Sequence, residues 1–206
     1  MYSTGIHISS FNPAARPSGD VLPWGHLAIG YLCLSLAIRA RWWVAPQGPA
    51  VIAVAIGTQL PDLIDKPLAW RFGLIPSGRS LAHSLVFFAA LAAIAWLLAT
   101  RYDRRVEGLA FIGGYLSHVL VDVLPAAMAG EWAKLGSLLW PITPVYEYSD
   151  EMDYSIIGFF LELELAEVVS FELGLTIVAI ALWIYDSRPG IGTMVRFGRR
   201  LRPGAE

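Results

Sequence analysis

Charged residues and cysteine are scarce in this chain of 206 residues. Only 16% of the residues are charged, whereas soluble domains usually contain about 25%. The apolar share is 56% and the mean hydropathy is +0.55. So little charge in so apolar a sequence excludes a disordered chain or a coiled coil and argues against an ordinary cytosolic enzyme. The composition favours a protein that crosses a membrane several times.

An excess of positive charge and a second cysteine are also missing. The chain has 15 basic and 17 acidic residues, which give a formal net charge of −2. Because no overall positive field exists to attract a polyanion, we expect no nucleic-acid partner. Cys33 is the only cysteine, so no disulfide can form within the chain. Membrane lipids are the expected surroundings, and the sequence leaves the oligomeric state open.

Long stretches with few charges indicate the membrane spans. A membrane helix needs about 20 mainly apolar residues to cross the hydrocarbon. The stretches that approach this length are 21–38, 42–61, 80–100, 108–121 and 155–185. The fourth is short and is expected to continue past Asp122. The sequence predicts an all-α fold, a polytopic membrane helix bundle of about five transmembrane helices.

The distribution of basic residues predicts the orientation of this bundle. Residues 1–20 lack the apolar stretch of a signal peptide and are expected to be a flexible tail. Residues 21–186 are expected to be the transmembrane domain, and 187–206 an arginine-rich tail. If the helices alternate in direction, ten basic residues fall on the side of this tail and five on the other. The positive-inside rule then places the C-terminus in the cytoplasm.

Ionisable residues gather at the opposite, outer side of the predicted bundle. Each lies where one of the expected helices begins or ends: His26, Asp62, Asp65, His83, His118 and Asp122. Such residues are costly at membrane depth unless they are paired, hydrated or bound to metal. Each alone has a simpler interpretation, since a histidine can form an interfacial hydrogen bond and Asp62 can cap a helical turn. Their convergence favours a shared site.

The spacing of these residues suits metal coordination. Asp62 and Asp65 are three positions apart and His118 and Asp122 are four apart, so each pair projects from one side of a helix. We expect the six residues to bind one or two divalent ions, zinc first, with manganese, iron or magnesium as alternatives. Metal ions lower the pKa of a bound water molecule and favour phosphoester hydrolysis.

The expected catalytic residues are His83, His118 and Asp122. Arg79 lies one turn before His83, and its planar guanidinium can pair with two oxygens of a substrate phosphate. It could equally be an interfacial arginine that extends toward lipid headgroups. The sequence therefore predicts a membrane-embedded hydrolase that acts through a metal-activated water on a phosphoester, either a small molecule or lipid-derived.

Short blocks around these residues resemble those of a known family. They are Gly25-His26-Leu27, LPDLID at 60–65, RSLAHS at 79–84, GYLSH at 114–118 with Asp122, and a weaker LLWP at 138–141. Across residues 24–148 the sequence is similar to the YdjM-like family of inner-membrane proteins. This resemblance implies a multi-pass protein of a prokaryotic inner membrane with metal-dependent hydrolase activity. The family is also distantly similar to zinc-dependent phospholipases C, which implies a phosphoester substrate.

The sequence departs from the family pattern at two positions. Where the family often has a histidine directly after the second aspartate, this chain has Lys66, and where it often has one before the third block, this chain has Gly78. The loss of two candidate ligands weakens the prediction of two ions more than the prediction of one.

Other interpretations stay open at this point. Glu167 in the fifth stretch is a further candidate metal ligand, or else a protonated acid hydrogen-bonded to a neighbouring helix. The acidic and aromatic loop 125–154 could form a lid or could simply be solvated. An ion or proton transporter would use Glu167 and Glu172 with the histidines as a relay. A non-catalytic membrane scaffold would use the arginine-rich tail, and a serine mechanism would use Ser84 without a Gly-x-Ser-x-Gly turn.

Overall fold

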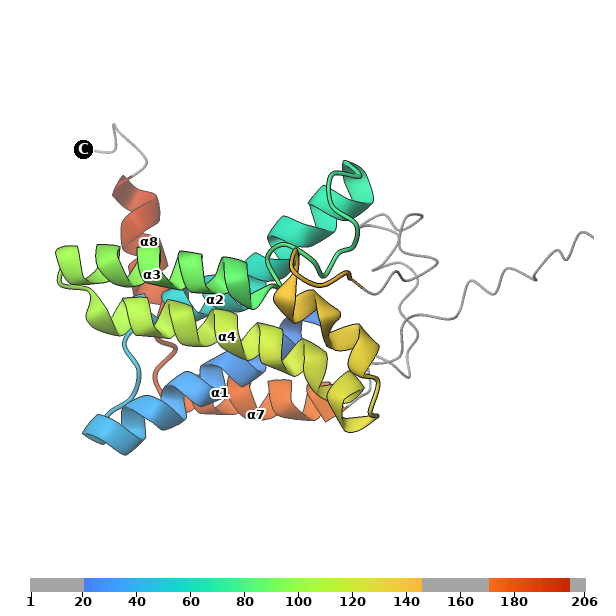
Figure 1. Ribbon diagram of the computed structural model, residues 1–206. Coiled ribbons are helices and arrows are strands. Elements are labelled where there is room, and N and C mark those ends of the chain that lie inside the picture. Colours follow the sequence, from blue (N-terminus) through green and yellow to red (C-terminus); the bar gives the residue numbers. More distant parts are fainter. Residues whose placement is uncertain (1–20, 146–170, 201–206) are drawn as a thin grey trace, which may run out of the picture.

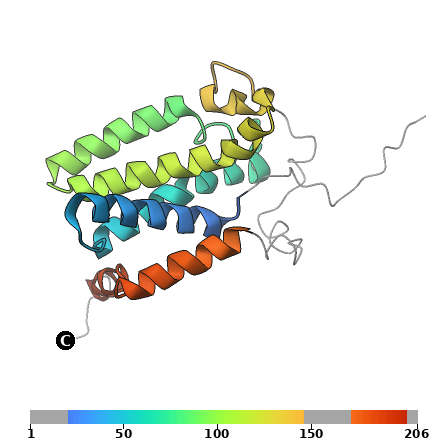
Figure 2. The ribbon, with the colours of Figure 1, turned by 90° about the horizontal axis from the view of Figure 1, so that it is seen from below.

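A computed structural model describes residues 21–145 and 171–200. These ranges contain helices and no strand, so the predicted all-α class is confirmed there. In chain order the elements are α1 (Pro23–Trp42), α2 (Gly48–Lys66), the π-helix η1 (Pro67–Arg71), α3 (Leu85–Arg101), α4 (Arg105–Met128), the 3₁₀ helix η2 (Trp132–Leu139), α7 (Phe171–Tyr185) and α8 (Ile191–Arg200). Helices α1, α2, α3, α4 and α7 form a bundle in which successive helices run in opposite directions (Figures 1 and 2).

Local sequence explains where several helices begin and end. Proline stands in the first turn of α1 and of α2, where its missing N–H costs nothing. Helix α3 begins after Ser84, whose hydroxyl accepts a hydrogen bond from the N–H of Val86 at 3.1 Å. Helix α1 ends at Trp43, which adopts a left-handed backbone conformation with φ of 59°.

Two glycines allow α2 and α4 to touch backbone to backbone. A Cβ atom on Gly57 would lie 2.3 Å from the carbonyl oxygen of Phe111, and one on Gly114 would lie 2.6 Å from that of Val54. Any larger residue would therefore force the helices apart. Small residues at crossings are typical of membrane helices. This contact brings Thr58 of α2 opposite His118 of α4.

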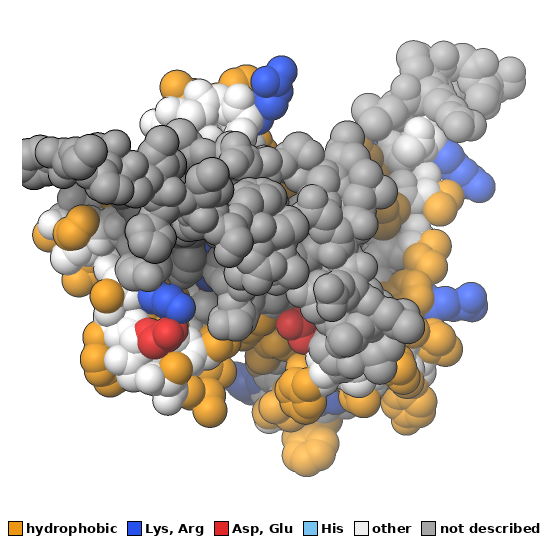
Figure 3. Space-filling view, turned by 90° about the vertical axis from the view of Figure 1, so that its right-hand side faces the viewer, with side chains coloured by type: hydrophobic (Ala, Val, Ile, Leu, Met, Phe, Trp, Pro, Cys, Tyr) orange, Lys and Arg blue, Asp and Glu red, His pale blue; other side chains and the backbone are white. Residues whose placement is uncertain are grey.

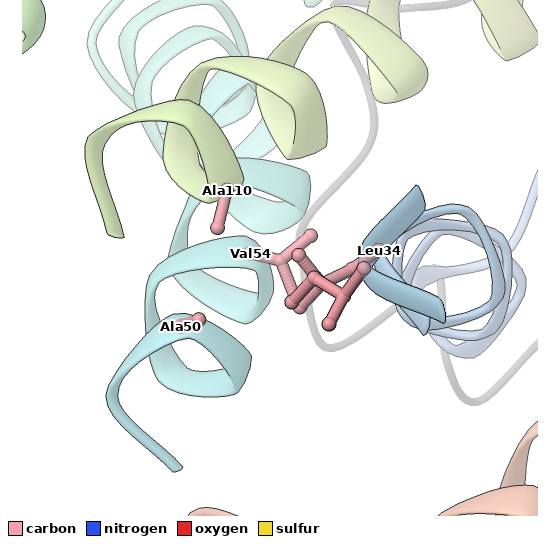
Figure 4. Packing of buried hydrophobic residues seen from close by; sticks show 5 residues of the cluster. Leu34, Ala50, Val54 and Ala110 are labelled. Carbon is pink, nitrogen blue, oxygen red and sulfur yellow. The ribbon is translucent and has the colours of Figure 1, made fainter. Parts of the chain in front are cut away.

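The apolar core lies between α1, α2 and α4. Leu34, Ala50, Val54 and Ala110 pack together there (Figure 4). A second cluster joins α1 to α7 through Ala28, Tyr31 and Ala179. At the end of α7 a polar network reinforces this pair of helices. The hydroxyl of Tyr31 donates a hydrogen bond to Asp186 at 2.6 Å, and Arg39 forms an ion pair with the same carboxylate.

The outer surface of the bundle is strongly apolar. On α3, Leu97 is 69% exposed and the only buried residue is Ala99. Hydrophobic side chains cover much of the described surface along the sides of the bundle, seen in Figure 3 from the end where η1 and η2 lie. Surfaces of this kind are unusual in soluble monomers and suit contact with lipid.

The number of membrane spans stays a prediction. Among the described residues one helix, α4, is both long and apolar enough to cross a membrane, and α3 and α7 are shorter apolar helices. Helices α1 and α2 have the length but carry charged residues near their ends. The fifth predicted span, 155–185, is described only from residue 171 onward. The tails 1–20 and 201–206 lie outside the described residues.

Candidate metal centre

The buried end of the bundle near η1 and η2 gathers two aspartates and two histidines. Asp62 lies near the end of α2, His83 lies in the turn before α3, and His118 and Asp122 lie one turn apart on α4. One ligand atom from each of these four residues lies within 4.8 Å of those from the others. The two histidines and Asp122 are buried and Asp62 is partly buried. This group of four, named the Asp–His cluster below, could hold a metal ion.

The distances within the cluster, at most 4.8 Å between any two ligand atoms, are close to those of a metal coordination shell. The Nε2 atoms of His83 and His118 are 3.1 Å apart. Oδ2 of Asp122 lies 3.3 Å from His83 Nε2 and 3.8 Å from His118 Nε2. Oδ1 of Asp62 lies 3.7 Å from both nitrogens. Around a tetrahedral zinc ion with bonds of 2.0–2.1 Å, ligand atoms are separated by roughly 3.3 Å. The four atoms therefore surround a volume that one ion fits.

The Nδ1 atom of each cluster histidine, which points away from the centre of the cluster, has a hydrogen-bond partner. His118 Nδ1 lies 2.6 Å from the carbonyl oxygen of Thr58, which can only accept, so this nitrogen carries a proton. His83 Nδ1 lies 2.9 Å from a carboxylate oxygen of Asp65 and donates to it. In the neutral rings both Nε2 atoms then present lone pairs to each other at 3.1 Å. Such an arrangement requires a cation or a proton at the centre.

The electrostatic surroundings of His83 favour positive charge. Burial alone would lower the pKa of the ring. Hydrogen bonds to Asp122 and Asp65 and the charges of Asp122 and Asp62 outweigh burial and raise the pKa of His83 to about 9. The carboxylates that stabilise a proton on His83 would also stabilise a metal ion in its place.

Asp65 lies behind His83 and outside the Asp–His cluster, although the sequence predicts it as a ligand. Its Oδ1 accepts the N–H of Ala82 at 2.8 Å, and its Oδ2 accepts the N–H of Ser80 at 2.9 Å as well as the ring of His83. The hydroxyl of Tyr115 binds the carbonyl of Ala82 at 2.5 Å from the other side. Asp65 and Tyr115 thus hold the turn that carries His83.

His26 is buried beside the cluster but supplies no atom to it. Its Nε2 lies 3.1 Å from Oδ1 of Asp122, the oxygen that faces away from the two histidines of the cluster. This contact lacks hydrogen-bond geometry, and neither nitrogen of His26 makes a hydrogen bond within the described part of the chain. The ring stacks on His118 with centroids 3.8 Å apart. His26 therefore packs against one cluster residue and touches another.

Two cations hold the carboxylates of the cluster. The Lys66 ammonium lies 2.5 Å from Oδ2 of Asp62, which leaves Oδ1 to face the histidines. Arg79 Nε lies 3.3 Å from Oδ2 of Asp122. Arg79, Asp122, Lys134 and Ser137 also line a cavity of about 20 Å³, which has room for one water-sized group. The ion pair of Lys66 with Asp62 was not predicted, although a separation of four residues is the usual spacing of a helical ion pair.

The remaining predicted residues do not join the cluster. Glu167 and the part of the loop 125–154 beyond residue 145 lie outside the described residues. Glu172 accepts a hydrogen bond from the N–H of Leu22 at 2.9 Å and so ties the start of α7 to the start of α1. The carbonyl of Thr58 could not be predicted from side-chain type, because any residue there supplies the same oxygen.

Comparison with known proteins agrees with this description. A family model described as YdjM inner membrane protein matches residues 22–193. No curated protein and no solved structure matches the chain. The matched range contains the whole Asp–His cluster together with the residues that hold it in place.

Proposed function

The chain belongs to the YdjM family of inner-membrane proteins, and from this premise we propose that it is a membrane-embedded, metal-dependent hydrolase. The observation that carries the proposal is the pair of Nε2 atoms 3.1 Å apart whose outer nitrogens are both committed to acceptors. Two carboxylate oxygens complete a four-atom shell around them. A metal ion at the centre would satisfy the lone pairs of both histidines and the charges of both carboxylates at once.

We propose a single ion of zinc type. Two imidazoles with two carboxylates suit zinc, with manganese or iron as alternatives, better than they suit magnesium, which prefers oxygen ligands. Lys66 holds the second oxygen of Asp62, and Arg79 lies beside Asp122. These two fixed positive charges oppose the binding of a second divalent ion next to the first.

The residues around the cluster have distinct roles in this proposal. A divalent cation held by these four residues would need to take a water molecule as a fifth ligand, and it would then supply the Lewis acidity that lowers the pKa of this water and makes it a nucleophile at neutral pH. Arg79 presents its guanidinium beside Asp122 and binds an oxygen of the substrate phosphate. Oδ1 of Asp122 and Nε2 of His26 face each other at 3.1 Å and can receive a proton. Asp65 keeps His83 oriented throughout.

The proposed substrate is a phosphoester, either lipid-derived or small. Arg79 and Lys134 lie beside Asp122 around the water-sized cavity, so a single oxygen of an anionic group is favoured there. Among the described residues the basic side chains of this end are Lys66, Arg71, Arg79 and Lys134, whereas most of the described arginines lie at the opposite end of the bundle, where α8 is found. By the positive-inside rule the cluster opens to the outer face of the membrane and α8 lies in the cytoplasm.

Metal analysis beside a hydrolysis screen tests the proposal. Protein purified without chelator is expected to carry close to one transition-metal ion per chain and to hydrolyse phospholipids or simple phosphodiesters. His118→Ala is expected to lose both properties. Ser117→Ala is the matched control, because the Ser117 hydroxyl only binds the carbonyl of Gly114 in its own helix at 2.7 Å. Wild-type protein free of transition metal, or His118→Ala with unchanged metal content, would refute the proposal.

A further inference from the structure

Helix α8 lies within the segment that the sequence predicts as an arginine-rich tail. It is a regular helix of 10 residues, Ile191–Arg200, that follows the turn after α7. Its N-terminal end packs on the start of α2, where a Cβ on Gly48 would lie 2.7 Å from Oγ1 of Thr193 and 2.9 Å from the backbone nitrogen of Gly190. The helix is therefore fixed to the bundle at one end and not a free extension.

The two faces of α8 differ sharply in chemistry. At 100° per residue, Ile191, Met194, Val195 and Phe197 fall within an arc of about 160°. These side chains are exposed, Met194 by 65% and Phe197 by 64%. The arginines lie outside this arc: Arg196, Arg199 and Arg200. An exposed apolar face beside a basic face matches a surface that contains both hydrocarbon and negative charge.

The orientation of α8 supplies the second observation. The bundle helices run along one direction in Figure 1, whereas α8 runs across it, and in Figure 2 α8 is seen end-on. At 1.5 Å per residue its 10 residues extend about 15 Å, half of what the hydrocarbon layer requires. It follows an apolar helix, α7, in a chain of an inner-membrane family. A helix perpendicular to membrane spans lies parallel to the membrane plane.

We propose that α8 lies in the headgroup layer of the membrane and binds anionic lipid. Met194, Val195, Ile191 and Phe197 enter the boundary between headgroups and acyl chains, as in other interfacial amphipathic helices. The three arginines contact lipid phosphates, and each strengthens binding to an anionic surface by about fivefold. The proposal is independent of metal binding and of hydrolysis.

Spin labels in the full-length protein test this placement. In a Cys33→Ser background, labels at Met194→Cys and Arg196→Cys are compared in vesicles of phosphatidylcholine with or without phosphatidylglycerol. The label at 194 is expected to be accessible to oxygen and shielded from an aqueous nickel complex, and the label at 196 to show the reverse. Arg199→Gln with Arg200→Gln is expected to lower the equilibrium constant for embedding at 194 by about 25-fold.

Two results would overturn the proposal. One is a label at 194 that the nickel complex reaches as readily as the label at 196, which would favour a soluble protein as the partner of this face. The other is equal shielding at 194 in both lipid mixtures. If a labelled variant fails to fold, amide exchange of the wild-type protein decides the matter. Residues 191–200 are expected to be more protected in vesicles with phosphatidylglycerol than in phosphatidylcholine alone, and equal protection in the two refutes the proposal.

Discussion

Gly114→Ala is expected to damage the metal centre without touching a ligand. The added Cβ would lie 2.6 Å from the carbonyl oxygen of Val54 and 2.9 Å from its Cγ2. Carbon and oxygen atoms in contact need about 3.3–3.6 Å, so α2 and α4 must separate by roughly 0.7–1 Å. The hydrogen bond between His118 and the carbonyl of Thr58, now 2.6 Å, would lengthen to roughly 3.5 Å and be lost.

The expected effect has two measurable parts. Overpacking lowers the free energy of unfolding by about 1–3 kcal/mol. Loss of the partner that orients His118 weakens metal binding by roughly 10–100-fold. Competition with a chelator gives the affinity, and thermal unfolding in detergent gives the stability. Gly113→Ala is the matched control, because a Cβ there meets nothing within 4 Å. The reasoning fails if the two variants bind metal with the same affinity.

Further predictions follow from other contacts. Asp65→Asn is expected to keep the metal stoichiometry but to weaken the affinity by roughly 10–100-fold, as measured by chelator competition; unchanged affinity would contradict the role given to Asp65. Tyr115→Phe leaves the carbonyl of Ala82 without its donor and is expected to lower stability by about 1–3 kcal/mol in thermal unfolding. Asp186→Asn removes the partner of Arg39 and is expected to lower the thermal midpoint while metal content stays the same, because this network lies at the other end of the bundle. Chelator treatment of the wild-type protein is expected to lower the midpoint and added zinc to restore it.

The sequence predicted which residues meet, because alternating helices place their ends together. Asp62 and His83 come from different elements, yet both belong at the end where α2 finishes and α3 begins. The one-turn spacing of His118 and Asp122 predicted their common side on α4. The structure places these four residues in one cluster. Residue spacing and helix direction were therefore sufficient to predict that these four residues lie together.

The sequence could not predict which of the six residues form the cluster and which only support it. Asp65 stands three positions after Asp62, so both project from one side of α2, and spacing alone treats them alike. Only the path of the turn before α3 decides between them, because its N–H groups wrap around the carboxylate of Asp65. The role of His26 likewise depends on the packing of α1 against α4. The amphipathic pattern of α8 was present in the sequence, but its many arginines led to the prediction of a tail and not of a helix.

X-ray absorption at the metal edge of the purified protein tests the central claim most directly, because it reports the ligands themselves. The account predicts one ion with two imidazole nitrogens at about 2.0–2.1 Å and two carboxylate oxygens, and His83→Ala is expected to lose this signal. A spectrum without imidazole scattering, or one that His83→Ala leaves unchanged, would contradict it.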